Sequence, residues 1–186
     1  MMDLMQLATA AALARRPNAG SGLPGYPQSE ILTRAHLLWL DARGSAEMPA
    51  RRQFPAATLE PLAAQVLVFG VEHEPLDFRY LEVGSRMRAL SNDDYTGRRL
   101  SEIPHQRAPS LVWDHLMAAM DARAPVRGVL PYVGRSREFS SIFHIVLPLA
   151  DDGETVDRLL VCVDLAPGAG SGVRLQDGTH PFTQLG

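Results

Sequence analysis

Hydrophobic positions recur along this chain with two different periods, one helical and one extended. Between residues 29 and 43 apolar side chains return every three or four positions, and Ser29 stands where an N-cap belongs. A second helical pattern follows Ser110 and carries Trp113 and Leu116 on one face. These patterns predict two amphipathic helices, each of which buries one face.

The extended period predicts five β-strands. In the segment 155–165 apolar residues occupy both faces, as expected for a strand in the middle of a sheet. Asp152-Gly153, just before it, is the strongest local hairpin signal in the chain. The predicted strands cover residues 65–72, a segment that begins at residue 78, and residues 126–133, 140–149 and 155–165.

The stretch 78–103 combines several local signals. Gly84 breaks the strand that starts at Phe78, and a short apolar pattern with helical spacing follows it. The turn-forming residues 92–94 come next, and Gly97 then supplies a position where a positive φ has no steric cost. The stretch is therefore predicted to form a strand, a turn, a short helix and a second helical turn.

The run 94–103, which reads DYTGRRLSEI, resembles the front half of a PAS sensory domain. Residues 48–51 (MPAR), 66–69 (VLVF) and 147–153 (LPLADDG) are similar to the single-domain PAS family common in alphaproteobacteria. The resemblance covers roughly residues 29–165. It implies an α+β fold: a PAS-like five-stranded antiparallel sheet with short helices on one face and an N-terminal amphipathic helix.

The resemblance also implies a strand order. The 155–165 strand should lie between the 65–72 and 140–149 strands, with the Trp113 helix across one face of the sheet.

We expect the chain to divide into three parts: a flexible N-terminal segment 1–28, a PAS-like domain 29–165 with its N-terminal helix, and a disordered C-terminal tail 166–186. The G-x-G-x-x-G at 20–25 falls in the first of these, without a preceding strand, and we interpret it as a coincidence of linker composition.

Composition argues against several classes of protein. The net charge of -3 argues against nucleic-acid binding, and no run of about 18 apolar residues exists to cross a membrane. All 18 basic residues are arginines, which excludes Schiff-base and P-loop lysine chemistry. Cys162, the single cysteine, cannot form an internal disulfide, and we interpret it as a small, buried, hydrophobic residue. We expect a cytoplasmic protein.

His115 and His144 are the histidines with a conceivable role. In haem-binding PAS domains the axial ligand comes from the helix on which His115 lies, so the resemblance makes His115 a candidate haem ligand. However, a position two residues from Trp113 points about 200° away from it, so a surface or boundary histidine is the favoured interpretation. No cofactor is predicted, with haem as the alternative. His144 lies opposite the Phe143 and Ile145 face of its strand, which predicts a core or interface histidine.

In PAS-like folds a ligand lies between the sheet and the short helices. The side chains expected at that site are bulky and apolar, so a ligand should be largely apolar with one or two hydrogen-bonding atoms. A fully packed core without a ligand is the alternative. The predicted pocket residues are Met87, Leu90, Tyr95, Leu100, Trp113, Leu116, Phe143 and Ile145.

The 29–43 helix has more apolar surface than one sheet contact needs, which predicts a homodimer through it. The predicted interface residues are Ile31, Ala35, Leu38 and Trp39.

The predicted function is a stand-alone PAS-like sensory or regulatory module that acts through ligand-dependent or partner-dependent protein contacts. Its output would pass to a separate signalling protein. The alternative is a small cone-shaped α+β enzyme, an isomerase or a hydrolase, with an acid or base in its pocket. A histidine and a carboxylate within hydrogen-bond reach inside the pocket would favour the enzyme.

Overall fold

The computed structural model describes residues 29–91, 93–134 and 136–167. The predictions for the N-terminal segment 1–28, and for the tail beyond residue 167, concern residues outside this range. The last strand includes residues 166 and 167, at which the tail was predicted to begin.

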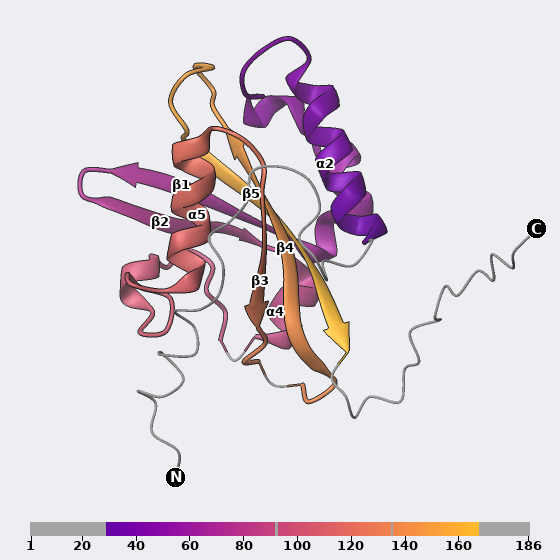
Figure 1. The fold of residues 1–186 in the computed structure, drawn as a ribbon, viewed down its shortest axis with the longest axis vertical. Coiled ribbons are helices and arrows are strands. Elements are labelled where there is room, and N and C mark those ends of the chain that lie inside the picture. The colour runs from indigo at the N-terminus through magenta and orange to yellow at the C-terminus, as the bar shows by residue number, and fades with distance from the viewer. Residues whose placement is uncertain (1–28, 92, 135, 168–186) are drawn as a thin grey trace, which may run out of the picture.

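The fold is α+β, with one five-stranded antiparallel sheet in the order β2-β1-β5-β4-β3 (Figure 1). The central position predicted for the last strand is confirmed, because β5 pairs with β1 on one side and with β4 on the other. The strands are β1 (Val66–His73), β2 (Leu76–Val83), β3 (Val126–Pro131), β4 (Phe139–Leu149) and β5 (Arg158–Pro167).

The β4–β5 connection is longer than the predicted hairpin. The Asp152 carboxylate accepts hydrogen bonds from the backbone N–H groups of Glu154 and Thr155, both at 2.8 Å. Gly153 adopts a φ of +83°, a value that glycine tolerates without strain. These contacts hold the chain in a bend through Thr155, and β5 starts at Arg158 rather than at the predicted residue 155.

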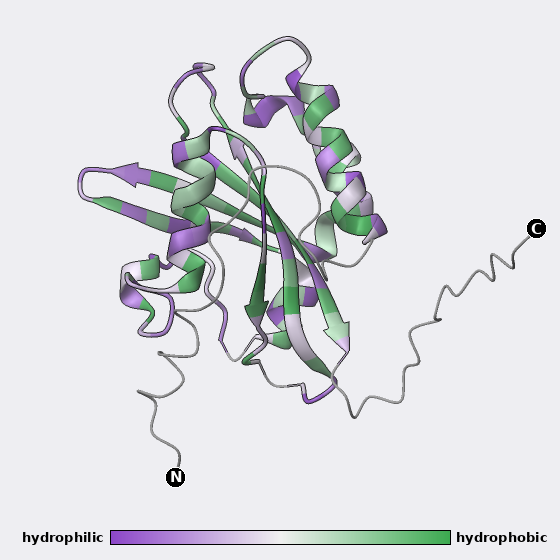
Figure 2. Ribbon diagram, viewed as in Figure 1, coloured by the Kyte–Doolittle hydropathy of each residue, from purple (hydrophilic) through white to green (hydrophobic). Residues whose placement is uncertain are grey.

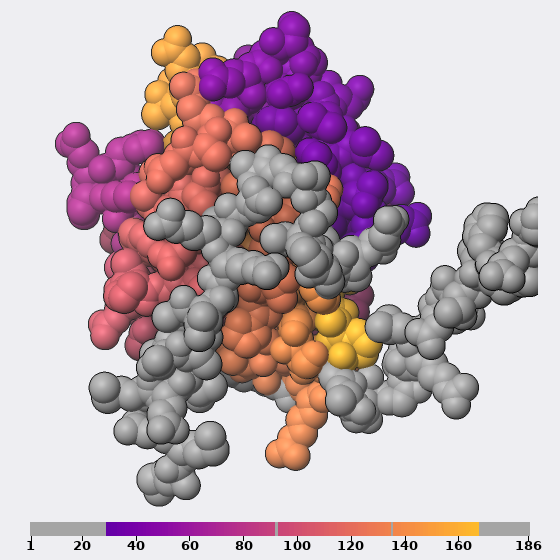
Figure 3. Space-filling model, viewed as in Figure 1, coloured from indigo at the N-terminus to yellow at the C-terminus, as the bar shows by residue number. Residues whose placement is uncertain are grey.

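Helices cover both faces of the sheet. Helix α2 (Glu30–Arg43) packs against β4 and β5, whereas α5 (Leu111–Ala122) packs against β3 and β4 (Figure 1). In the space-filling view the α2 segment lies beside the β3–β4 segment (Figure 3). The remaining helices are η1 (Arg51–Gln53), α3 (Ala56–Leu59), η2 (Glu60–Gln65), α4 (Ser85–Leu90) and η3 (Leu100–Glu102).

Cross-strand register shows which residues belong to each face. Arg127 of β3 pairs with Ile145 of β4, and directly paired residues point to the same side of a sheet. The Arg127 guanidinium lies 3.2 Å from the imidazole Nδ1 of His36 on α2, so Ile145 also faces α2. His144, one residue away, must therefore face α5.

The predicted orientation of β4 is consequently wrong. Phe143 and Ile145 lie on the α2 side, while Ile142 and His144 lie on the α5 side. Residues 144–149 of this strand are all buried. Hydrophobic residues are frequent along the strand (Figure 2), so the relative hydrophobicity of its faces could not identify which one meets α5.

Helix α2 begins at Ser29, whose hydroxyl accepts a hydrogen bond from the Leu32 N–H at 3.1 Å. Its inner face is buried against its own sheet, and the Trp39 indole N–H donates to the Pro148 carbonyl at 2.8 Å. Ala35 and Trp39 are therefore wrong as dimer-interface residues, because the sheet already covers them. Ile31 and Leu38 are partly buried against the same core.

Helix α5 is rotated relative to the prediction. Its N-cap is Ser110, which accepts from the Trp113 N–H at 3.1 Å, but its buried residues are His115, Leu116 and Ala119. Trp113 is partly buried at the margin, edge-on to Phe78 at 5.0 Å. The prediction that the Trp113 helix crosses one face is confirmed, whereas the prediction of a surface or boundary position for His115 is wrong.

Candidate functional site

A cavity of about 140 Å³ lies between the α5 side of the sheet and the helices α4 and α5. We call it the main cavity. Six of its lining side chains carry polar atoms: Tyr80, Ser91, Tyr95, Gln106, His115 and His144. The rest of the wall is apolar and consists of Leu67, Phe69, Val83, Met87, Val112, Leu116, Leu130, Ile142, Val146, Val161 and Val163.

A second space of about 100 Å³, the side cavity, adjoins the main cavity. The Tyr132 hydroxyl closes part of its wall by donating to the Leu90 carbonyl at 3.0 Å. The two cavities share Met87, Ser91, Tyr95, Gln106 and Ile142. A ligand in the main cavity could therefore extend into the side cavity.

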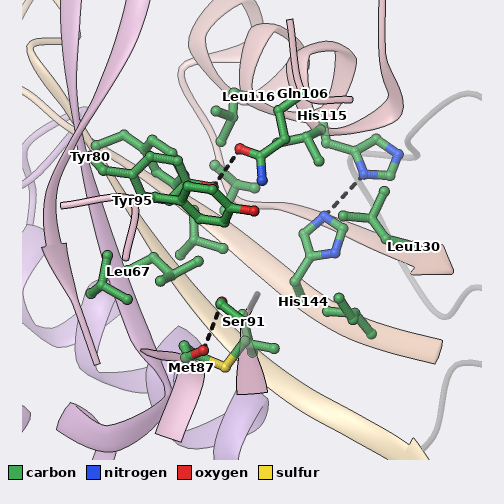
Figure 4. A pocket seen from close by; sticks show the side chains of 17 residues that line it. Leu67, Tyr80, Met87, Ser91, Tyr95, Gln106, His115, Leu116, Leu130 and His144 are labelled. Carbon is green, nitrogen blue, oxygen red and sulfur yellow. Dashed lines mark hydrogen bonds between the residues drawn. The ribbon is translucent and has the colours of Figure 1, made fainter. Parts of the chain in front are cut away.

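Gln106 presents a hydrogen-bond donor to the main cavity. Its backbone N–H donates to the Ile103 carbonyl at 2.9 Å, and its side-chain Oε1 accepts from the Tyr80 hydroxyl at 2.8 Å. Burial raises the pKa of Tyr80, so this phenol keeps its proton. Because the amide oxygen is engaged, the amide nitrogen is the end directed into the cavity (Figure 4).

Tyr95 contributes a hydroxyl to the same space. Its ring stacks on Tyr80 with 5.7 Å between centroids, and the Arg98 guanidinium lies 5.8 Å from its centroid. Burial, together with nearby Asp93, raises the pKa of Tyr95, which keeps the phenol protonated. The hydroxyl points into the cavity (Figure 4) and has no hydrogen-bond partner among the residues that the structure describes.

His115 and His144 form a buried pair on the opposite wall. The His115 Nδ1 and the His144 Nε2 are 3.0 Å apart, and the ring centroids are 4.9 Å apart (Figure 4). Burial and then the neighbouring His115 lower the pKa of His144 to about 3. Burial also lowers the pKa of His115, against a smaller opposing effect of Asp114. Both rings are therefore neutral at pH 7, and one donates its N–H to the other.

Gly128 of β3 makes room for this pair. A Cβ at this position would lie 2.6 Å from the Cε1 of His115 and 2.7 Å from the Cε1 of His144. Any side chain here would displace the rings. The two imidazoles can therefore meet only because the strand opposite them has no side chain at this point.

The structure brings together some of the predicted pocket residues and separates others. Met87, Tyr95 and Leu116 line the main cavity, and Leu90 lines the side cavity. Phe143 and Ile145 are on the other face of the sheet, for the register reason given above. Leu100 is fully buried away from both cavities, and Trp113 packs on Phe78 instead.

Haem does not fit this arrangement. The main cavity is close to the ~150 Å³ apolar cavity that holds benzene in another protein, and a tetrapyrrole is several times larger. Within the described part of the chain, no group of three or more His, Cys, Asp or Glu side chains is placed to hold a metal ion.

Sequence reasoning missed Gln106 and the pairing of the two histidines. Gly128 was the available signal for the pair, because a glycine inside a strand indicates a close approach by another group. Gln106 lies between helical elements with no periodic pattern around it, and no local signal marks it as a lining residue.

No protein-family model matches the chain, and a search of curated proteins finds no similar sequence. In residues 29–167, apart from 92 and 135, the structure has no helix of the length and hydrophobicity needed to cross a membrane.

Proposed function

We propose that this chain is a PAS-like sensory or regulatory module that binds a small, largely apolar molecule in the main cavity and passes the signal to a partner protein. The main cavity is the observation that supports this proposal most. It combines an apolar wall with a few convergent polar groups, which is the usual construction of a small-molecule site. The resemblance of the 94–103 run and the α+β architecture agree with it.

The acid–base enzyme is the weaker candidate. Catalysis of that kind would use a histidine oriented by a carboxylate within hydrogen-bond reach. The described residues that line the two cavities include histidines but no Asp or Glu. The paired histidines also direct their facing nitrogens at each other rather than at the cavity.

A homodimer through α2 is proposed on different residues from those first predicted. Leu37 is 60% exposed and Leu40 is 36% exposed, so the outward side of this helix carries apolar surface that the sheet does not cover. Such a surface could also serve the partner protein.

Ligand binding can be tested by native mass spectrometry of the protein purified from its own host. We expect a small-molecule adduct on the wild type. Val146→Phe should abolish the adduct, because Val146 lines the main cavity and a phenyl ring would occupy the space. Val129→Phe is the matched control, since Val129 is partly exposed on an edge strand and lines neither cavity.

An adduct that persists in Val146→Phe, or a wild type that carries none, would contradict the proposal. The second result would indicate that the main cavity holds no small molecule in the host cell.

A further inference from the structure

One end of the main cavity is polar, and its polar atoms come from two separate segments. Gln106 follows η3, and Tyr95 lies between α4 and η3. Each residue is 8% exposed, so both are nine-tenths buried. Figure 4 shows the Gln106 amide nitrogen and the Tyr95 hydroxyl oxygen pointing into the same space. We call these two atoms the polar end.

The hydrogen-bonding capacity of the polar end is specific. The Gln106 oxygen accepts from Tyr80 and the amide nitrogen points into the cavity, so the group that this side chain presents to a ligand is its N–H donor. Tyr95 adds a hydroxyl that can donate, with no partner among the described residues. Both groups line the cavity and are directed into it (Figure 4). A ligand that brings an acceptor oxygen to this point would accept hydrogen bonds from both.

The rest of the wall carries no formal charge. No Arg, Asp or Glu is among the described residues that line the main cavity. The His115–His144 pair is buried and neutral. A carboxylate placed here would lose its hydration without gaining a counter-charge, which strongly disfavours anionic ligands.

Size restricts the ligand further. A volume of about 140 Å³ suits one six-membered ring, and the adjoining side cavity leaves room for a small substituent.

We infer that the ligand of the main cavity is a neutral, single-ring compound whose carbonyl or hydroxyl oxygen accepts hydrogen bonds from Gln106 and Tyr95. This inference rests on the proposed ligand-binding function and adds the chemical class.

Three probes that share one ring test it: benzene, benzaldehyde and benzoate. Their dissociation constants for the full chain would be measured at pH 7.5 by calorimetry or ligand-observed NMR. Benzaldehyde should bind about tenfold more tightly than benzene, the usual value of a net hydrogen bond. Benzoate should bind more weakly than either, because its charge is buried without a partner.

Two variants test whether the polar end causes the tighter binding of benzaldehyde than of benzene. Gln106→Met removes the amide donors at similar volume, and Tyr95→Phe removes only the hydroxyl. Each should reduce the benzaldehyde-to-benzene affinity ratio by about fivefold to tenfold. Gln65→Met is the matched control, since Gln65 ends η2 and lines neither cavity, and it should keep the wild-type ratio. Tyr95→Phe keeps the test decisive if loss of the Tyr80 partner prevents Gln106→Met from folding.

The outcomes distinguish failure of the inferred ligand class from failure of the proposed ligand-binding function. Equal binding of benzene and benzaldehyde, or tighter binding of benzoate, would overturn the inference while leaving a ligand-binding cavity. An unchanged affinity ratio in Tyr95→Phe would also overturn it. Failure of all three probes to bind at millimolar concentration would overturn the proposed ligand-binding function itself.

Discussion

The two faces of the sheet are built differently. On the α2 side, Trp39 and Ile145 are 1% and 0% exposed, and packing there is dense. On the α5 side the sheet leaves a cavity, and two neutral histidines contact each other within its wall. One sheet thus carries a layer that supplies stability and a layer that leaves room for a ligand. The candidate site lies on the less densely packed face.

The largest expected effect tests the dense face. Trp39→Ala removes a fully buried indole and leaves the Pro148 carbonyl without its donor. We expect it to lower the free energy of unfolding by about 3–5 kcal/mol, measured by urea denaturation. Leu116→Ala, on the helix beside the cavity, should lower the free energy of unfolding by less than Trp39→Ala does, because part of the space around Leu116 is already empty. Equal losses in the two variants would contradict the contrast between the faces.

A substitution on β3 tests the histidine pair. Gly128→Ala places a methyl group against both imidazoles and should lower the free energy of unfolding by about 2 kcal/mol. His115→Ala should relieve part of this cost, so the double variant should be more stable than the sum of the two single effects predicts. Additive effects would show that the rings are not what Gly128 accommodates.

The pH dependence of stability tests the neutral state of the pair. The folded protein holds both pKa values below 6.5, so between pH 6.5 and 5 the unfolded chain binds more protons. Stability should therefore fall as the pH falls through this window, by about 2 kcal/mol. Above about pH 7.5 the pair should contribute no slope, because the histidines are then deprotonated in both the folded and the unfolded states. The double variant His115→Leu/His144→Leu, measured in parallel, should not show this loss of stability between pH 6.5 and 5. A pH profile identical to that of the wild type would contradict the neutral state of the pair.

The smallest effect on stability tests the outward side of α2. Leu37→Asp changes an exposed residue and should alter the free energy of unfolding by less than about 0.5 kcal/mol. If α2 forms the proposed homodimer, this variant should have half the mass of the wild type by light scattering. A mass of Leu37→Asp equal to that of the wild type would contradict the proposed homodimer.

The sequence was most informative where one pattern had one explanation. Apolar residues on both faces of the 155–165 segment predicted a central strand, and β5 is central. The same reasoning failed on β4, because His144 makes one face look less apolar although both faces are covered. A buried histidine needs a partner, and here the partner is 29 residues away on α5.

The cavity itself could not be predicted from periodicity. Its volume depends on how closely α5 approaches the sheet, and that distance depends on Gly128 as much as on the helix. Met87, Tyr95 and Leu116 were found because they belong to segments with a clear pattern. Gln106 belongs to no such segment, and it becomes visible only through its bond to Tyr80.

Two consecutive residues of β3 join the faces that the sheet separates. Gly128 contacts the histidine rings on the cavity side, while the Arg127 side chain reaches His36 of α2 on the other side. A movement of the histidine rings would press on the peptide group between Arg127 and Gly128. The Arg127 side chain contacts His36 on α2. β3 is an edge strand with a single sheet neighbour, so it can shift at lower cost than β5 could. This peptide therefore lies between the histidine pair of the cavity wall and helix α2.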